Sequence, residues 1–65
     1  MTGAQRRENA GIVVGTWYTY AGPVEWLHGR TCQTIRLVED HFEVLIANVV
    51  ATVRPSSLLP YGTKL

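Results

Sequence analysis

Two apolar stretches separated by only two residues constrain the fold of this chain more than any other feature. The stretches 44–46 and 49–53 are rich in valine and other strand-favouring residues. Asn48 lies between them, and an asparagine tolerates the positive φ that a tight hairpin turn needs. Pro55 follows and removes a ladder donor, so the second stretch has a clear end. We therefore predict a buried antiparallel hairpin in the C-terminal half of the chain.

Glycine and proline divide the rest of the chain into further short, strand-like segments. The strands that we expect are 12–20 with a bend at Gly15, 24–27, 31–38, 42–46 and 49–53. Alternation within 31–38 places Ile35 and Leu37 on one face and Arg36 on the other. Residues 56–59 fit one short 3₁₀ turn. Five short strands spaced about ten residues apart predict an all-β, SH3-like small barrel with five strands.

The length of the chain, 65 residues, is enough for one small domain. We expect residues 1–10 to be a flexible N-terminal arm, 11–61 to form the barrel and 62–65 to be a loose tail. So small a domain has a marginal core, and disulfides, a metal or self-association usually compensate. Cys32 is the single cysteine, and no paired Cys/His spacing of a zinc site is present. We therefore predict no metal, no cofactor and a homo-oligomer.

Charge and hydropathy restrict the class of partner. The formal net charge is +1, whereas strong nucleic-acid binders usually carry a basic excess, although a local basic patch remains compatible with this total. No stretch approaches the roughly 20 apolar residues of a membrane span, and the N-terminus lacks the apolar core of a signal peptide. A lone cysteine without an export signal is typical of a reducing compartment. We therefore expect a cytoplasmic protein without a membrane partner.

Two segments of the chain resemble the Sm and Hfq-like proteins, a family of small SH3-like barrels. Residues 22–26, Gly-Pro-Val-Glu-Trp, are similar to a segment in the bent second strand of that family. Residues 49–56, Val-Val-Ala-Thr-Val-Arg-Pro-Ser, are similar to its last strand. The resemblance implies a small barrel that forms a ring. It does not imply the uridine site of Hfq-like proteins, because Ile46, Ala47 and Asn48 stand where those proteins have a Tyr-Lys-His type of triplet.

Aromatic residues in the first strand are the first candidates for a binding site. Alternation places Trp17 on one face and both Tyr18 and Tyr20 on the other. We interpret Trp17 and Trp26 as covered residues, in the core or in a subunit interface. For Tyr18 and Tyr20 two alternatives stay open: an exposed pair that stacks on bases or on peptide prolines, or a pair that is covered.

Three arginines are the other candidate ligand-binding residues. Arg30, Arg36 and Arg54 could contact phosphates, because a guanidinium group matches phosphate oxygens. The alternative is ordinary solvated charge paired with nearby carboxylates. The carboxylates available for this are Glu25, Glu39, Asp40 and Glu43.

The sequence offers two weak catalytic groupings, and we predict that the protein is not an enzyme. Residues 39–41, Glu-Asp-His, fall at an expected hairpin tip, where such residues simply meet water. Cys32 and His28 have no third, orienting group at a recognisable spacing, and a lone cysteine is usually a small buried hydrophobe. The function that we expect first is regulatory binding of RNA or single-stranded DNA by an oligomer. The alternative is a protein-interaction module, such as a small inhibitor or adaptor that docks on a larger protein.

Overall fold

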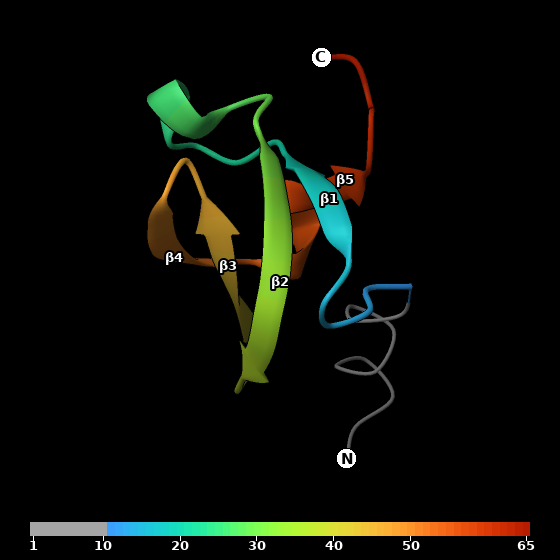
Figure 1. The fold of residues 1–65 in the computed structure, drawn as a ribbon, viewed down its shortest axis with the longest axis vertical. Coiled ribbons are helices and arrows are strands. Elements are labelled where there is room, and N and C mark those ends of the chain that lie inside the picture. The colour runs from blue at the N-terminus through green and yellow to red at the C-terminus, as the bar shows by residue number, and fades with distance from the viewer. Residues whose placement is uncertain (1–10) are drawn as a thin grey trace.

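The computed structural model describes residues 11–65, so the expected arm at 1–10 lies outside the described residues. The elements are β1 (Trp17–Tyr20), η1 (Glu25–Leu27), β2 (Thr31–Val38), β3 (His41–Ile46), β4 (Val49–Val53), η2 (Pro55–Ser57) and β5 (Leu58–Pro60), where η denotes a 3₁₀ turn. The strands form one antiparallel sheet in the order β4-β3-β2-β1-β5 (Figure 1). The predicted all-β class and the number of strands are confirmed for this part of the chain.

The predicted C-terminal hairpin is present as β3 and β4. Ile46 pairs with Val49, so the turn contains only Ala47 and Asn48. Both turn residues have positive φ, 51° and 67°. Left-handed conformation at both central residues matches the right-handed twist of the flanking strands, which is why two-residue turns of this kind close hairpins. The expected role of Asn48 is confirmed.

Three of the predicted segments differ from the structure. Residues 12–14 form no strand, because Gly11 and Gly15 both adopt positive φ and the chain turns between them. Residues 24–27, predicted as a strand, contain η1, and this turn carries the side chain of Leu27 into the core. The second 3₁₀ turn begins one residue earlier than expected, and residues 58–60 form β5. The strand expected at 24–27 is thus absent, and β5 near the C-terminus brings the number of strands to five.

A bulge in β2 changes the predicted face of one residue. The pairing of β2 with β3 shifts between Thr34 and Arg36, which leaves Ile35 as the extra residue. Arg36 pairs with Glu43, and Glu43 lies on the opposite face of β3 from the buried Val44. The prediction that Arg36 faces away from Ile35 by simple alternation is therefore wrong. An extra residue in one strand interrupts alternation, and sequence periodicity alone does not reveal it.

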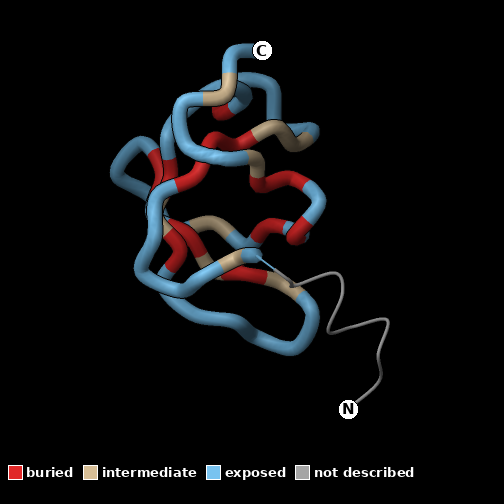
Figure 2. The backbone as a smooth tube through the Cα atoms, turned by 90° about the vertical axis from the view of Figure 1, so that its right-hand side faces the viewer, coloured by how far each residue is buried: buried red, intermediate tan, exposed pale blue. Residues whose placement is uncertain are grey.

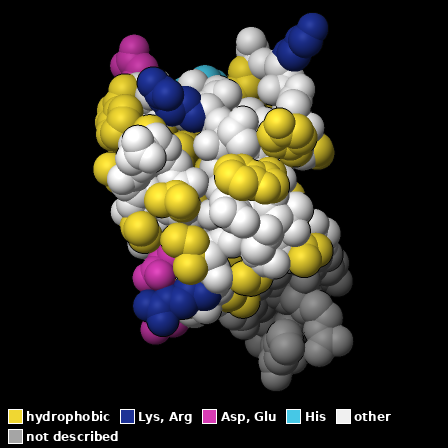
Figure 3. Space-filling view, in the orientation of Figure 1, with side chains coloured by type: hydrophobic (Ala, Val, Ile, Leu, Met, Phe, Trp, Pro, Cys, Tyr) yellow, Lys and Arg dark blue, Asp and Glu magenta, His cyan; other side chains and the backbone are white. Residues whose placement is uncertain are grey.

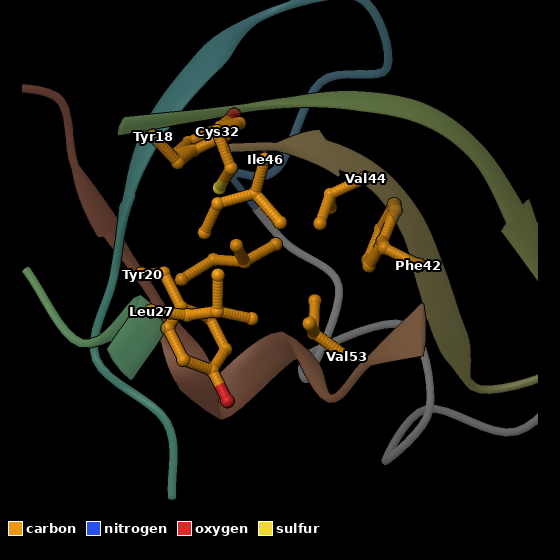
Figure 4. Packing of buried hydrophobic residues seen from close by; sticks show 9 residues of the cluster. Tyr18, Tyr20, Leu27, Cys32, Phe42, Val44, Ile46 and Val53 are labelled. Carbon is orange, nitrogen blue, oxygen red and sulfur yellow. The ribbon is translucent and has the colours of Figure 1, made fainter. Parts of the chain in front are cut away.

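The core lies on the concave side of the bent sheet, which we call the inner face. Its residues are Tyr18, Tyr20, Leu27, Cys32, Phe42, Val44, Ile46, Val53 and Leu58. They come from all five strands and from η1, and in Figure 4 their side chains point toward one another. In Figure 2 the buried stretches face one another across the interior. Val53 pairs with the buried Phe42 and Val50 with the exposed Leu45, so Val53 lies on the inner face and Val50 on the opposite one.

Candidate functional site

Tyr18 and Tyr20 are core residues, with exposed fractions of 8% and 2%. The Tyr18 hydroxyl accepts a hydrogen bond from the backbone N–H of Val13 at 2.7 Å and donates one to the carbonyl of Gly11 at 3.1 Å. The Tyr20 hydroxyl accepts from the N–H of Val24 at 3.2 Å. The alternative in which these tyrosines form an exposed stacking pair is therefore wrong. Their hydroxyls hold the segments that flank β1.

The close packing around Tyr20 explains a glycine in the loop after β1. A Cβ atom built on Gly22 would collide with the ring and hydroxyl of Tyr20. Such an overlap with a buried ring leaves no room for any larger residue. Gly22 belongs to the segment that resembles a bent strand of the Sm and Hfq-like proteins, but here it lies in a loop that covers a core side chain.

The three candidate arginines are exposed, but they do not form one cluster. Arg36 donates to Glu43, with Nε and Oε1 2.8 Å apart and Nη2 and Oε2 3.3 Å apart. These hydrogen bonds raise the pKa of Arg36 and hold the pKa of the Glu43 carboxyl below its ordinary value. Arg30 donates from Nε to the carbonyl of Trp26 at 3.1 Å. Arg30 lies just before β2 and Arg36 lies within it, toward its far end. At the rise of an extended strand the two residues are about 20 Å apart. The carboxylate-paired alternative is confirmed for Arg36.

Arg54 lines a small polar hollow at the end of β4. The hollow has a volume of about 280 Å³ and is lined by Asp40, His41, Arg54, Pro55 and Ser56. Nδ1 of His41 lies 2.7 Å from Oδ1 of Asp40, and both side chains are open to water. A carboxylate beside the guanidinium group would oppose the binding of an anion. The hollow brings together two of the groups singled out in the sequence, but their charges do not favour one ligand.

Cys32 is fully buried, and this confirms its interpretation as a small core hydrophobe. Burial raises the pKa of its thiol, so the thiolate form that would react is disfavoured. His28 directs Nδ1 toward the carbonyl of Gly22, 3.1 Å away, at the protein surface.

Among residues 11–65, no group of three or more metal-ligating side chains is close enough to hold a metal ion. Within the same residues, no helix has the length and hydropathy of a membrane span.

The convex side of the sheet, the outer face, carries a row of side chains that crosses four strands. Trp17 pairs with Gln33, Gln33 with Leu45, and Leu45 with Val50. We call these four residues the outer row. Residues directly opposite each other on neighbouring strands point to the same face, with Cβ atoms about 5 Å apart. The row therefore runs without a break from β1 to β4.

The three apolar members of the outer row are exposed. Trp17 is 50%, Leu45 42% and Val50 62% accessible to solvent. Gln33 lies between them and donates from Nε2 to the carbonyl of Gly15 at 3.1 Å. Ile35, the extra residue of the bulge, is 43% exposed beside the row. Figure 3 views this side of the sheet, with β2 nearest the viewer, and hydrophobic side chains spread across its middle while charged groups lie toward its ends.

The outer row was not predicted from the sequence. The interpretation of Trp17 and Trp26 as core residues is wrong, because their side chains are 50% and 61% exposed. The alternative that a subunit interface covers them stays a prediction. The signal that could have found the row is the absence of alternation in 44–46 and 49–50. A continuous apolar run makes both faces of a strand apolar. A small domain with a single sheet has too few other elements to cover both faces.

Comparisons with known proteins give no match. No protein-family model matches the chain. Searches among curated proteins and among solved structures also found no significant match.

Proposed function

We propose that this chain is a protein-interaction module that docks on a larger protein through the outer row. The observation that carries the proposal is the exposure of Trp17, Leu45 and Val50 side by side on one face. Contiguous exposed apolar surface marks sites of protein association, and tryptophan is over-represented among the residues that dominate binding energy. The partner surface is apolar and uncharged at its centre, because nothing in the outer row offers it a countercharge.

The edge of this surface also fits a protein interface. The Arg36–Glu43 ion pair lies on the same face as the outer row, at one side of it. A polar rim around an apolar centre is the usual anatomy of an interface between proteins. Rim charges of this kind steer and orient a partner more than they add affinity.

We further propose that the five strands form an SH3-like barrel that stays open between its two edge strands, β4 and β5. Three observations support this finer description: the strand order, the position of η2 between the last two strands, and a core drawn from every strand. The resemblance to Sm and Hfq-like proteins receives less support. Its first segment, 22–26, lies in a loop and a 3₁₀ turn.

Binding of RNA or single-stranded DNA stays a prediction. It would rest on Arg30 and Arg54, since Arg36 is paired and the two tyrosines are buried. Fluorescence anisotropy with a mixed pool of short oligonucleotides at low salt tests it, and Arg54→Ala should then weaken binding and flatten its salt dependence. Saturable binding with that behaviour would favour the nucleic-acid function over the one proposed.

Site-specific photo-cross-linking tests the protein-interaction function. A photoreactive phenylalanine analogue replaces Trp17 in one version of the chain and Tyr61 in a matched control, because both side chains are exposed aromatics. In cells that produce the protein, we expect position 17 to yield a discrete adduct with one larger protein. Leu45→Ser should abolish that adduct, since it removes the neighbouring apolar contact. Equal labelling at 17 and 61, or adducts that contain only copies of this chain, would contradict the proposal.

A further inference from the structure

The free edge of β4 lacks the features that normally protect an edge strand. In residues 11–65 β4 pairs with β3 alone, through five residue pairs without a register shift. The strand contains no charged residue and no proline. The opposite edge, β5, is only three residues long and ends in Pro60. Monomeric proteins guard their edges with charges, prolines, bulges or short strands, so β5 is guarded and β4 is open.

The geometry of the hairpin determines which backbone groups of β4 point outward. In a hairpin with a two-residue turn, the flanking pair Ile46 and Val49 exchanges hydrogen bonds. Successive pairs alternate, so Val50 and Thr52 direct their N–H and C=O groups away from β3. These groups form a template on which another extended chain can pair.

We propose that β4 pairs antiparallel with β4 of a second copy of this chain, about a two-fold axis at Ala51. In this register Val50 lies opposite Thr52 of the second copy, and the two residues exchange both of their outward hydrogen bonds. The symmetry repeats the same exchange on the other side of the axis. All of the outward donors and acceptors of Val50 and Thr52 are then paired.

A second copy fits this edge because the side chains that lie opposite each other in the two strands attract each other or are neutral. Val49, which is 43% exposed, lies opposite Val53 of the second copy. Val50, which is 62% exposed, lies opposite Thr52, and such β-branched cross-strand pairs stabilise sheets. The nearest charge, Arg54, lies opposite the neutral Asn48. No like charges meet across the axis, whereas a charged edge would repel its own copy.

This pairing goes beyond the proposed docking function and does not depend on it. The outer row binds through side chains on one face of the sheet, whereas the pairing uses backbone groups at its edge. In the dimer the sheet continues from one copy into the other, so two outer rows lie on one extended face.

Molar mass in solution tests the pairing. Light scattering on the full chain at micromolar concentration should report a dimer. Thr52→Pro removes an outward N–H but no hydrogen bond to β3, so the variant should be a monomer with the parent's circular dichroism spectrum. Thr52→Val is the matched control, because it keeps the N–H, and it should remain a dimer. A parent that is monomeric throughout the range, or a folded Thr52→Pro variant that stays dimeric, would overturn the proposal.

A second variant keeps the test decisive if proline prevents folding. Val50→Lys alters an exposed side chain and places two lysines diagonally across the axis, so the dimer should dissociate. A dimer that survives this change overturns the proposed register.

Cross-linking tests the register directly. Around the axis Ala51 faces its own copy as a non-hydrogen-bonded pair, with Cα atoms about 4.5 Å apart, within disulfide range. Ala51→Cys should therefore form a symmetric disulfide dimer on mild oxidation. Thr52→Cys should not, because the same residues in the two copies are then offset along the strands. Faster cross-linking at 52 than at 51 would show a different register and overturn the proposal.

Discussion

The two faces of the sheet are both apolar, yet only one of them is buried. On β3 the inner residues Val44 and Ile46 are 0% and 1% exposed, whereas Leu45, between them, is 42% exposed. These side chains are of one chemical class, so composition does not explain the difference. The inner face is covered because the sheet bends and because η1 and β5 bring Leu27 and Leu58 over it. The chain therefore carries more apolar strand surface than its own fold covers.

Aspartate at two adjacent positions of β3 should have very different effects on stability, because one side chain faces the core and the other faces solvent. Val44→Asp buries a carboxylate without a partner, and we expect a loss of about 4 kcal/mol or more, enough to unfold a domain of this size. Leu45→Asp places the same group in solvent and should change the free energy of unfolding by less than about 1 kcal/mol. Urea denaturation followed by circular dichroism measures both. Equal destabilisation would mean that Leu45 is also covered, for example by a second copy.

Removal of the buried Thr34 hydroxyl should have a smaller effect than a buried charge. Thr34 is 1% exposed, and its Oγ1 donates to the carbonyl of Val13 at 2.9 Å and accepts from the N–H of Thr16 at 3.3 Å. Thr34→Val keeps the shape but removes these bonds, so we expect a loss of about 1–2 kcal/mol. Thr31→Val, on an exposed position of the same strand, is the matched control and should change stability by about 0.5 kcal/mol or less. Thermal melts that rank the two variants in the reverse order would contradict the burial of the Thr34 hydroxyl and its hydrogen bonds.

The ion pair on the outer face should have the smallest effect. Arg36 and Glu43 are solvated, so Arg36→Gln should scarcely change the melting temperature at neutral pH. Because the pKa of Glu43 is lowered in the folded state, its contribution is present above the ordinary carboxyl pKa and is lost as pH falls through the folded value. Any difference between parent and variant should therefore vanish at acid pH and in high salt. A melting temperature that falls as far as for Thr34→Val would show that the pair is shielded from solvent.

The sequence predicted the elements whose signals are local. The β3–β4 hairpin follows from β-branched residues on both sides of Asn48, and its turn geometry depends on those residues alone. The β2 strand, residues 31–38, was also predicted with its observed bounds. In both cases the information lies within about ten residues of chain, which periodicity and turn chemistry can resolve.

Features that depend on distant contacts were not predictable. Residues 24–27 have the apolar composition of a strand, but they contain η1. This turn forms because Leu27 reaches the core and the Tyr20 hydroxyl accepts a hydrogen bond from the N–H of Val24. Whether Trp17 or the two tyrosines enter the core depends on which face of β1 lies on the inner side of the sheet. Alternation separated these residues correctly and left the direction open, and the candidate site was placed on the wrong face for that reason.

The bulge at Ile35 has a consequence for changes in the length of the chain. Because Ile35 has no partner on β3, its removal would leave the pairs Thr34–Val44 and Arg36–Glu43 in register. Deletion of Cys32, which pairs with Tyr18 and Ile46, would instead turn the residues between it and the bulge to the opposite face. Side chains of the core would then exchange places with side chains of the surface. β2 thus contains one position where a deletion preserves the strand register, and deletions at the positions beside it would disrupt the register and the core. Homologues with a shorter β2 should therefore lack the residue that corresponds to Ile35.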